Sequence, residues 1–399
     1  MIPIKVKIIK DAVHGDIECS ELEMELIDSC HFQRLRKIGQ LGLSDLVYPS
    51  ANHTRYEHSL GVMHLAGKIS HSLGLNQKDT RLIRIAGLLH DIGHLPFSHT
   101  LESVLSPTTD HLHETNAINI IENDFSELFE KHDIDKTAVQ DMIIGKGKYG
   151  KILSSGVDID KLDYLTRDSY FTGVAYGVID LSRLMHIATI ENGTFAFQEK
   201  GLRTIESVIL ARFMMFSAVY DYTTKRTAER MLFRALDAMD RRSLNITKLL
   251  KIDEVDFLST LRQQDGYTKD IIDRIDQRRI FKTARIITKD DLSTEHVTRC
   301  LEIKDNLPQL KRIENLIANK LEIPEGYIIL DIMNYPKGIE HINIKKDNGD
   351  IVKLKDISAL SRSLMRQRWQ DWRVSFLCPK EYRQIVKENA KSLFLKHLN

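Results

Sequence analysis

Residues 87–99 read GLLHDIGHLPFSH, and this stretch decides both the fold class and the chemistry of the chain. The run 83–89 is mostly apolar with a helical pattern, so His90 and Asp91 are expected at the end of a buried helix that Gly93 and Pro96 then break. A His-Asp dipeptide by itself is most often a solvated surface pair. At the end of a buried helix, however, its polar groups are costly unless a metal ion or hydrogen bonds satisfy them.

Two further segments carry side chains that bind metals. His58 closes the segment TRYEH (54–58), and the segment VDIDKLDYLTRD (157–168) holds four carboxylates, of which the first three are the candidate ligands. Two imidazoles and two carboxylates suit one divalent ion of Mn, Fe, Zn, Ni or Mg, and an octahedral ion would keep positions open for water and phosphate. The candidate ligands are therefore His58, His90, Asp91 and one acid among Asp158, Asp160 and Asp163.

Composition limits the class of protein. The chain has 399 residues, 42% of them hydrophobic, and 57 basic against 56 acidic residues, so a sizeable core is expected and a general polyanion-binding surface is not. Its four cysteines form no CxxC pair, and no apolar run reaches the length of a membrane span. Because residues 1–15 also lack the pattern of a signal peptide, the chain is predicted to be cytoplasmic, without a membrane partner.

The hydrophobic pattern predicts a mostly α fold, with a helical core and a smaller C-terminal α+β region. We expect a catalytic core over 1–245, nearly all-helical with small hairpins, and an α+β region over 246–399 with an oligomerisation or regulatory role. Helices are predicted over 20–42, 55–74, 79–90, 113–123, 126–132, 158–171, 201–220, 224–241, 308–320, 356–368 and 379–395. Strands are predicted over 4–9, 278–288 and 326–333, and hairpins turn at Asn192-Gly193 and Asn348-Gly349.

Six blocks of sequence, in order along residues 10–174, resemble the HD-domain phosphohydrolase superfamily, and within it the branch that contains the deoxynucleoside triphosphate (dNTP) triphosphohydrolases. They are KDAVHGDIE (10–18), FQRLRKIGQLGL (32–43), NHTRYEHSLGVMHLAG (52–67), LLHDIGHLPFSH (88–99), HLHE (111–114) and VDIDKLDYLTRDSYFTGV (157–174). The resemblance implies a helical fold and a metal-dependent enzyme that hydrolyses dNTPs to deoxynucleoside and triphosphate. It favours Asp160 as the fourth metal ligand, with additional Mg possible on the nucleotide.

The resemblance also assigns roles around the metal. His99, with His94 as its rival, would protonate the leaving oxygen, and Glu102 and His113 would support it, Glu102 standing where relatives often have Asp. The substrate-binding set that the resemblance implies is Gln40, Leu41, Arg55, Lys161, Tyr164 and Asp168. Arg55 has independent support, because it lies one helical turn before His58 and can reach a phosphate at the metal.

A separate group of residues resembles the site of an activating guanine nucleotide in regulated members of the family. It consists of Lys7, Asp28, Gln33 and Arg36. An ordinary solvated helix face explains the same residues equally well. The family also implies a homo-oligomer, dimer or tetramer, whereas the sterile-alpha-motif domain of some relatives has no counterpart in this sequence.

Three other functions remain open at this stage. The chain could be an HD-type nucleotidase or a phosphodiesterase acting on mono- or cyclic nucleotides, or a nucleotide-binding regulator with weak chemistry. Nucleic-acid binding is disfavoured, because the basic cluster of Lys225, Arg226 and Arg230 is interrupted by Asp237 and Asp240 and fits a solvated helix face or an oligomer interface better.

Overall fold

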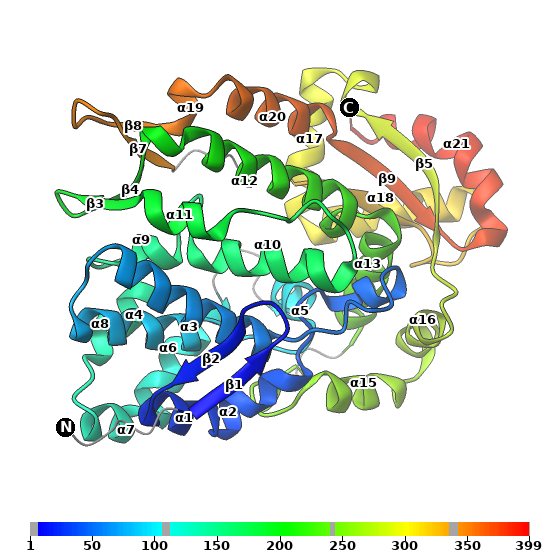
Figure 1. The fold of residues 1–399 in the computed structure, drawn as a ribbon. Helices are drawn as coiled ribbons and strands as arrows, with labels where there is room; N and C mark the ends of the chain where they lie inside the picture. Colours follow the sequence, from blue (N-terminus) through cyan, green and yellow to red (C-terminus); the bar gives the residue numbers. More distant parts are fainter. Residues whose placement is uncertain (1–6, 106–111, 240–243, 335–341, 399) are drawn as a thin grey trace.

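Three helices form the centre of the fold and carry the motifs described above. The computed structural model describes residues 7–105, 112–239, 244–334 and 342–398, and in it α3 (Arg55–Ser72) packs between α4 (Gln77–Leu89) and α10 (Ile159–Thr172) (Figure 1). Each helix begins at a side-chain cap: Thr54 and Glu57 form a capping box on α3, Asn76 caps α4, and Asp158 caps α10. These caps fix the helix ends at which the polar motif residues lie.

The N-terminal segment differs from its prediction. A hairpin of β1 (Lys7–Asp11) and β2 (Gly15–Cys19) occupies the stretch expected as a strand and a turn. The single helix predicted over 20–42 is divided into α1 (Glu21–Ile27), α2 (Cys30–Arg34) and two short 3-10 helices, Leu35–Lys37 and Gly42–Leu46. The division follows from Ser29, whose hydroxyl accepts from the Phe32 amide and starts a second helix. The break leaves residues 38–41 as a loop, and Gly39 pairs with Thr54 in front of α3.

Shorter helices surround the three central ones. They are α5 (Ser98–Leu105), α6 (Leu112–Asp124), α7 (Ser126–Lys131), α8 (Lys136–Ile143), α9 (Gly150–Leu153) and α11 (Leu181–Ile187). The hairpin of β3 (Ala188–Glu191) and β4 (Thr194–Gln198) turns at Asn192 and Gly193, both with positive φ, as the Asn-Gly signal predicts. Two long helices follow, α12 (Leu202–Met215), continued by a π-helical turn over Phe216–Tyr220, and α13 (Thr223–Asp237).

The C-terminal region is α+β, as predicted. The antiparallel sheet β5-β9-β6 joins Lys282–Thr288, Arg373–Cys378 and Ile329–Ile332, and α21 (Arg383–Leu395) packs against it at the upper right of Figure 1. The central strand β9 was not predicted. The remaining elements are α14 (Ile246–Leu249), α15 (Glu254–Arg262), α16 (Gly266–Asp276), a 3-10 turn (Lys289–Asp291), α17 (Thr294–Asp305), α18 (Leu307–Lys320), β7 (Asn343–Lys345), β8 (Ile351–Lys353), α19 (Leu354–Ile357) and α20 (Ala359–Gln370).

Apolar packing runs across residue 245. The largest cluster of buried side chains centres on α3, α4 and α10 and includes Ile342, Ile344 and Leu354 from the far end of the chain. A second cluster joins Leu95 and Leu101 to α13, α15 and α16. In the same way β7 extends the β3-β4 hairpin into a four-stranded sheet. The division at 245/246 remains a prediction about organisation, and the two parts share cores.

The fold class is confirmed as mostly α with a smaller α+β region. In the described part of the chain no helix is long and apolar enough to cross a membrane. All four cysteines are free thiols.

Gly93→Ala is expected to destabilise the protein by about 1–3 kcal/mol, the usual cost of overpacking. A Cβ at Gly93 would lie 2.2 Å from the His113 carbonyl oxygen and 2.5 Å from the Ala117 nitrogen, and backbone atoms of α6 cannot move aside as a side chain can. Urea denaturation measures the free energy of unfolding. Ser103→Ala, at an exposed position of α5, is the control, and equal stability of the two variants would contradict the expected clash.

Candidate active site

Three helix ends bring the candidate metal ligands together. His58 lies in the first turn of α3, His90 and Asp91 follow the last residue of α4, and Asp160 lies in the first turn of α10. One ligand atom each from His58, His90 and Asp160 lies within 4.8 Å of the others. The Asp91 carboxylate adds Oδ1 at 3.3 Å from His90 Nε2 and Oδ2 at 3.8 Å from His58 Nε2. The structure therefore groups His58, His90 and Asp160, and it places the Asp91 carboxylate beside both imidazoles.

The electrostatics of this group fit a divalent cation. Burial alone would lower the pKa of His58, but hydrogen bonds from Asp160 and Asp163 raise it to about 10, so surplus negative charge surrounds the ring. His90 donates from Nδ1 to the Gly87 carbonyl oxygen at 2.8 Å, and its Nε2 is buried without a hydrogen-bond partner among the described residues. A buried nitrogen with a free lone pair that faces two carboxylates is what a metal ion requires.

Asp163, weighed in the sequence only as a rival ligand, lies on the opposite side of His58. Its carboxylate accepts from His58 Nδ1 at 2.7 Å, from His14 Nε2 at 2.6 Å and from Arg167 Nε at 2.9 Å. Arg167 also pairs with Asp11 at 2.7 Å, which ties the β1-β2 turn to α10. The carboxylate thus directs His58 Nε2 toward the metal position, as acids behind histidine ligands do. The i,i+4 spacing of Asp163 and Arg167 was the available signal for this pair.

Asp158 faces away from the ligand group. Its carboxylate accepts from the Lys161 amide and lies 2.8 Å from Lys161 Nζ, so it acts as the helix N-cap that its position suggests. Of the three rival acids in this segment, Asp160 alone faces both His58 and His90.

The predicted catalytic histidines form a second cluster beside the metal ligands. His94 Nε2 lies 3.0 Å from Asp91 Oδ1, and its ring stacks on that of His113 at a centroid distance of 4.1 Å. Glu102 lies 3.4 Å from His113 Nδ1 and accepts from the Ser98 hydroxyl, which in turn contacts His94 Nδ1 at 2.6 Å. Glu102 therefore reaches both rings in spite of being longer than Asp.

A pocket of about 470 Å³ opens next to these clusters and collects most of the predicted substrate residues. Gln40, Leu41, Arg55, Tyr164, Asp168 and His99 all line it. The Asp168 carboxylate in this pocket is held by His53 Nε2 and by the Tyr220 hydroxyl, each at 2.7 Å. Tyr220, which also lines the pocket, was not identified from the sequence, because it lies 52 residues beyond its partner and ends a helix without a motif.

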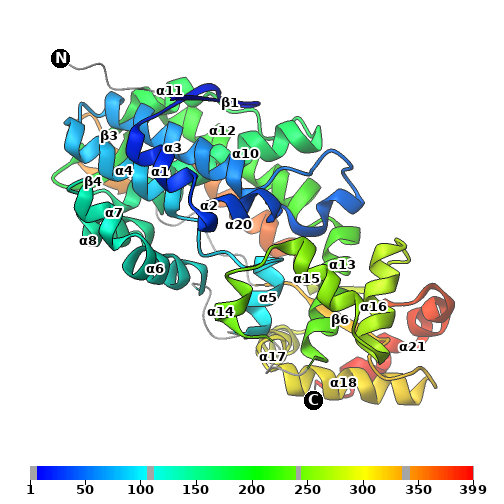
Figure 2. The same cartoon turned by 90° about the horizontal axis from the view of Figure 1, so that it is seen from below.

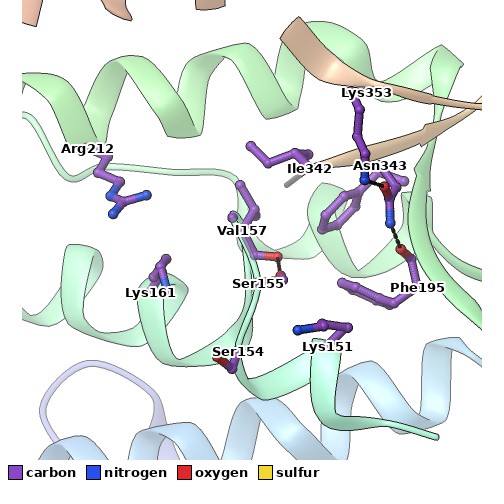
Figure 3. A pocket seen from close by; sticks show the side chains of 12 residues that line it. Lys151, Ser154, Ser155, Val157, Lys161, Phe195, Arg212, Ile342, Asn343 and Lys353 are labelled. Atoms are coloured by element: carbon purple, nitrogen blue, oxygen red, sulfur yellow. Dashed lines mark hydrogen bonds between the residues drawn. The ribbon is translucent and has the colours of Figure 1, made fainter. Parts of the chain in front are cut away.

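Lys161 lines a different cavity, of about 380 Å³ (Figure 3). Arg212 of α12 points into the same space, and its Nε is buried without a hydrogen-bond partner in the described structure. Lys151 and Lys353 complete a set of four cations, and the described residues that line this basic cavity include no acid, although Asp158 lies 2.8 Å from Lys161 Nζ. Arg212 is a second candidate phosphate contact that the sequence analysis missed.

The four residues of the predicted effector site lie at the N-terminal edge of the core. Arg36 donates to the Gln33 side chain at 2.8 Å and to the Tyr56 hydroxyl at 2.6 Å, and it stacks over the Tyr56 ring. Asp28 is exposed at the end of α1, and Lys7 begins β1 opposite Cys19. Arg36 is thus positioned by Gln33 and Tyr56, and its contacts neither require nor exclude a bound nucleotide.

The basic residues of α13 serve internal contacts. Arg226 and Arg230 both pair with Asp331 of β6, at 2.8 Å each, and Lys225 pairs with Glu229 at 3.0 Å in the wall of the pocket. The basic side chains that could have formed a nucleic-acid surface are therefore paired with acids of the same chain.

Comparison with known families finds two matches that divide the chain. Residues 55–168 match the model of the HD domain, and residues 179–397 match that of the HD associated region. The first range contains every candidate metal ligand, and the second begins after α10 and runs to residue 397, while the segment before residue 55 lies outside both.

Several proteins are similar over most of the chain. An uncharacterized protein of Methanocaldococcus jannaschii is 38% identical over 96% of this chain and 82% of its own length. The deoxynucleoside triphosphate triphosphohydrolase SAMHD1 homolog of Dictyostelium discoideum is 33% identical over 59% of this chain and half of its own length. The SAMHD1 protein of Homo sapiens is 26% identical over 98% of this chain and 72% of its own length.

Solved structures share the whole architecture. A hypothetical protein from Aquifex aeolicus superposes with a TM-score of 0.78 at 28% identity, covering 96% of this chain and 99% of its own. A phosphohydrolase from Bacteroides thetaiotaomicron superposes with a TM-score of 0.74 at 24% identity, covering 94% of this chain, and supports the fold alone.

Asp163→Asn is expected to lower the affinity for a divalent metal by about 10- to 100-fold, the usual cost of losing an acid behind a histidine ligand. The asparagine removes the charge that orients His58 and leaves all four candidate ligands in place. Titration with Mn²⁺ at a temperature where both proteins are folded measures the affinity. Glu127→Gln, an exposed acid on α7, is the control, and unchanged binding in Asp163→Asn would contradict the orienting role.

Proposed function

The chain belongs to the HD-domain phosphohydrolases, in their dNTP triphosphohydrolase-like branch, and on this premise we propose that it hydrolyses dNTPs to deoxynucleoside and triphosphate. His58, His90, Asp91 and Asp160 are the proposed ligands of one divalent metal ion. When bound, such an ion would lower the pKa of a water molecule and offset phosphate charge.

The observation that carries the proposal is a series of buried polar atoms without hydrogen-bond partners along the site. Within the described residues they are His90 Nε2 at the metal position, Arg55 Nε and Gln40 Oε1 in the pocket, and Arg212 Nε in the basic cavity. Each such atom costs about 1–3 kcal/mol when left unpaired. A ligand with a metal-bound phosphate, further phosphates and a sugar hydroxyl would satisfy all of them.

The pocket residues have complementary tasks in this proposal. Arg55 pairs with Asp91 through Nη1 at 2.6 Å and keeps Nε for a phosphate oxygen. Lys161 and Arg212 would receive the remaining phosphates, because both line the basic cavity and Arg212 Nε has no hydrogen-bond partner among the described residues; Lys161 would contact a phosphate while it stays paired with Asp158. Asp168, held by His53 and Tyr220, would accept the sugar 3′-hydroxyl, and Gln40 and Leu41 would enclose the sugar.

His99 is the proposed acid for the leaving 5′-oxygen. His99 is exposed on the side of the pocket and enclosed by protein elsewhere. This enclosure, and to a smaller extent the charge of Arg55, lowers the pKa of His99. The imidazole is therefore neutral before substrate binds. A triphosphate beside it would raise the pKa again, so that protonation accompanies binding. His94 already contacts Asp91 and is the weaker candidate.

Assembly and regulation are proposed on the same premise. A homo-oligomer, dimer or tetramer, is expected, with the HD-associated region in contact between subunits. Lys7, Asp28, Gln33 and Arg36 are proposed to bind an activating guanine nucleotide. The oligomer and the effector site are both proposed from the family. In addition, Gln33 and Tyr56 hold the Arg36 guanidinium in a fixed position, where it could bind an effector phosphate.

Incubation of the metal-loaded protein with each dNTP and NTP, followed by chromatography, tests the reaction. Release of deoxynucleoside and triphosphate is expected from wild type, and His90→Ala should abolish both metal binding and turnover because it removes a ligand. Elemental analysis gives the metal content. Release of monophosphate or pyrophosphate would assign a different phosphohydrolase, and cleavage of mono- or cyclic nucleotides alone would favour a nucleotidase or phosphodiesterase.

Arg36→Ala is expected to remove stimulation by guanine nucleotides while the metal content stays that of wild type. The measurement is the rate of hydrolysis of one dNTP against GTP or dGTP concentration. Lys37→Ala, on the next exposed position, is the control. A wild-type rate that does not respond to guanine nucleotides would reject the effector site and leave the hydrolase proposal standing.

A further inference from the structure

The segment 252–254 of the HD-associated region, which leads into α15, lies against two loops of the active-site pocket. Figure 2 shows α14 and α15 beside α2 and α5. The segment contacts these loops through Glu254, at Gly39 in the stretch 39–43 that lines the pocket and at Phe97, which lines the pocket and leads to His99. It therefore connects the two matched regions of the chain at the place where the proposed substrate would bind.

The Glu254 carboxylate makes the closest of these contacts. Its Oε1 accepts from the Phe97 amide at 3.1 Å, and the Gly39 amide also donates to the carboxylate. A Cβ at Gly39 would lie 3.3 Å from Glu254 Oε2, so the glycine allows the close approach. One carboxylate thus joins two loops that are separate in the sequence.

Phe97 needs such a contact. Its φ of 47° lies in the left-handed region, which is unfavourable for a bulky side chain and persists only when neighbouring contacts enforce it. The Phe97 carbonyl oxygen accepts from the amides of Thr100 and Leu101 and so starts α5. The conformation of this one residue decides where Ser98, His99 and Glu102 point.

Arg34 fixes the same segment from the other side. Its guanidinium donates to the Ile252 carbonyl oxygen at 3.2 Å and to the His94 carbonyl oxygen at 2.6 Å. The turn between His94 and Phe97 is therefore held at both ends, by Arg34 and by Glu254. Lys37 adds a weaker contact, 3.6 Å from Asp253.

Glu254 is partly buried, and a carboxylate at this position is costly. Enclosure by the surrounding protein raises the pKa of the Glu254 carboxyl to about 7, even though the two backbone amides and Arg55 act in the opposite direction. An apolar side chain could fill the space without that cost, but it could not accept from two amides.

We infer that Glu254 is a positioning residue, through which the HD-associated region holds the two loops of the pocket in their catalytic arrangement. This inference rests on the proposed function for its effect on turnover, although the contact itself does not depend on it. Glutamine at 254 keeps the size of the side chain but offers one oxygen acceptor, and its NH₂ group would face an amide donor.

The test compares Glu254→Gln with Asp256→Asn, which removes an exposed carboxylate from the same helix. Hydrogen exchange followed by mass spectrometry is expected to be faster in Glu254→Gln over residues 39–43 and 97–105 and unchanged over α3 and α10. For the dNTP that wild type hydrolyses, kcat/KM should fall by about 10- to 100-fold, since small displacements of catalytic groups have effects of this size. Metal content should stay that of wild type, and Asp256→Asn should match wild type throughout.

Unchanged exchange in the two loops, or faster exchange with an unchanged kcat/KM, would overturn the inference. Should Glu254→Gln unfold the whole chain, Glu254→Asp replaces it: the charge is kept, the shorter side chain cannot span both amides, and the same localised result is expected, whereas wild-type behaviour would overturn the inference. Absence of nucleotide hydrolysis by wild type would contradict the proposed function. The exchange pattern would then still decide whether Glu254 holds the loops.

Discussion

One buried carboxylate, that of Asp163, organises the centre of this molecule. It accepts from His58, His14 and Arg167, and these three residues come from α3, the β1-β2 hairpin and α10. The contact requires the two helices to approach so closely that a Cβ at Gly61 would lie 1.9 Å from Asp163 Oδ1. Because a buried carboxylate must be neutralised, the position of each partner is constrained by the others. The alignment of the ligand helices therefore follows from charge compensation as much as from apolar packing.

Local signals predicted the parts of the fold that depend on neighbouring residues. The Asn192-Gly193 turn and the cap at Asp158 occur where the sequence places them, because a turn and an N-cap need few distant contacts. The long helix predicted over 20–42 is wrong, since the apolar spacing continues through Ser29 while the serine hydroxyl starts a new helix. Strand β9 escaped prediction because its pairing partners, β5 and β6, lie far from it in the sequence.

In the candidate site, too, residues in motifs were predicted, whereas residues that act through distant partners were not. The motifs identified the residues that the three helix ends bring together. Their proximity was expected because the motifs follow one another along the chain in the same order as in the family. Asp163, Tyr220, Arg212 and Glu254 were missed or misread because each acts through a partner that no spacing rule reveals. Tyr220 reaches Asp168, and Glu254 reaches Phe97 across 157 positions. Residues that orient others are therefore harder to find than residues of a type that binds metal or phosphate.

The placement of Lys161 and Tyr164 has a consequence for how the catalytic cycle would end. These residues lie one turn apart on α10, yet Tyr164 lines the pocket of about 470 Å³ and Lys161 lines the basic cavity. If the substrate spans both, cleavage separates two products that sit in different compartments. Each could then depart through its own opening, so the kinetics would show random release of products, and accumulated triphosphate would occupy the enzyme without blocking the nucleoside from leaving.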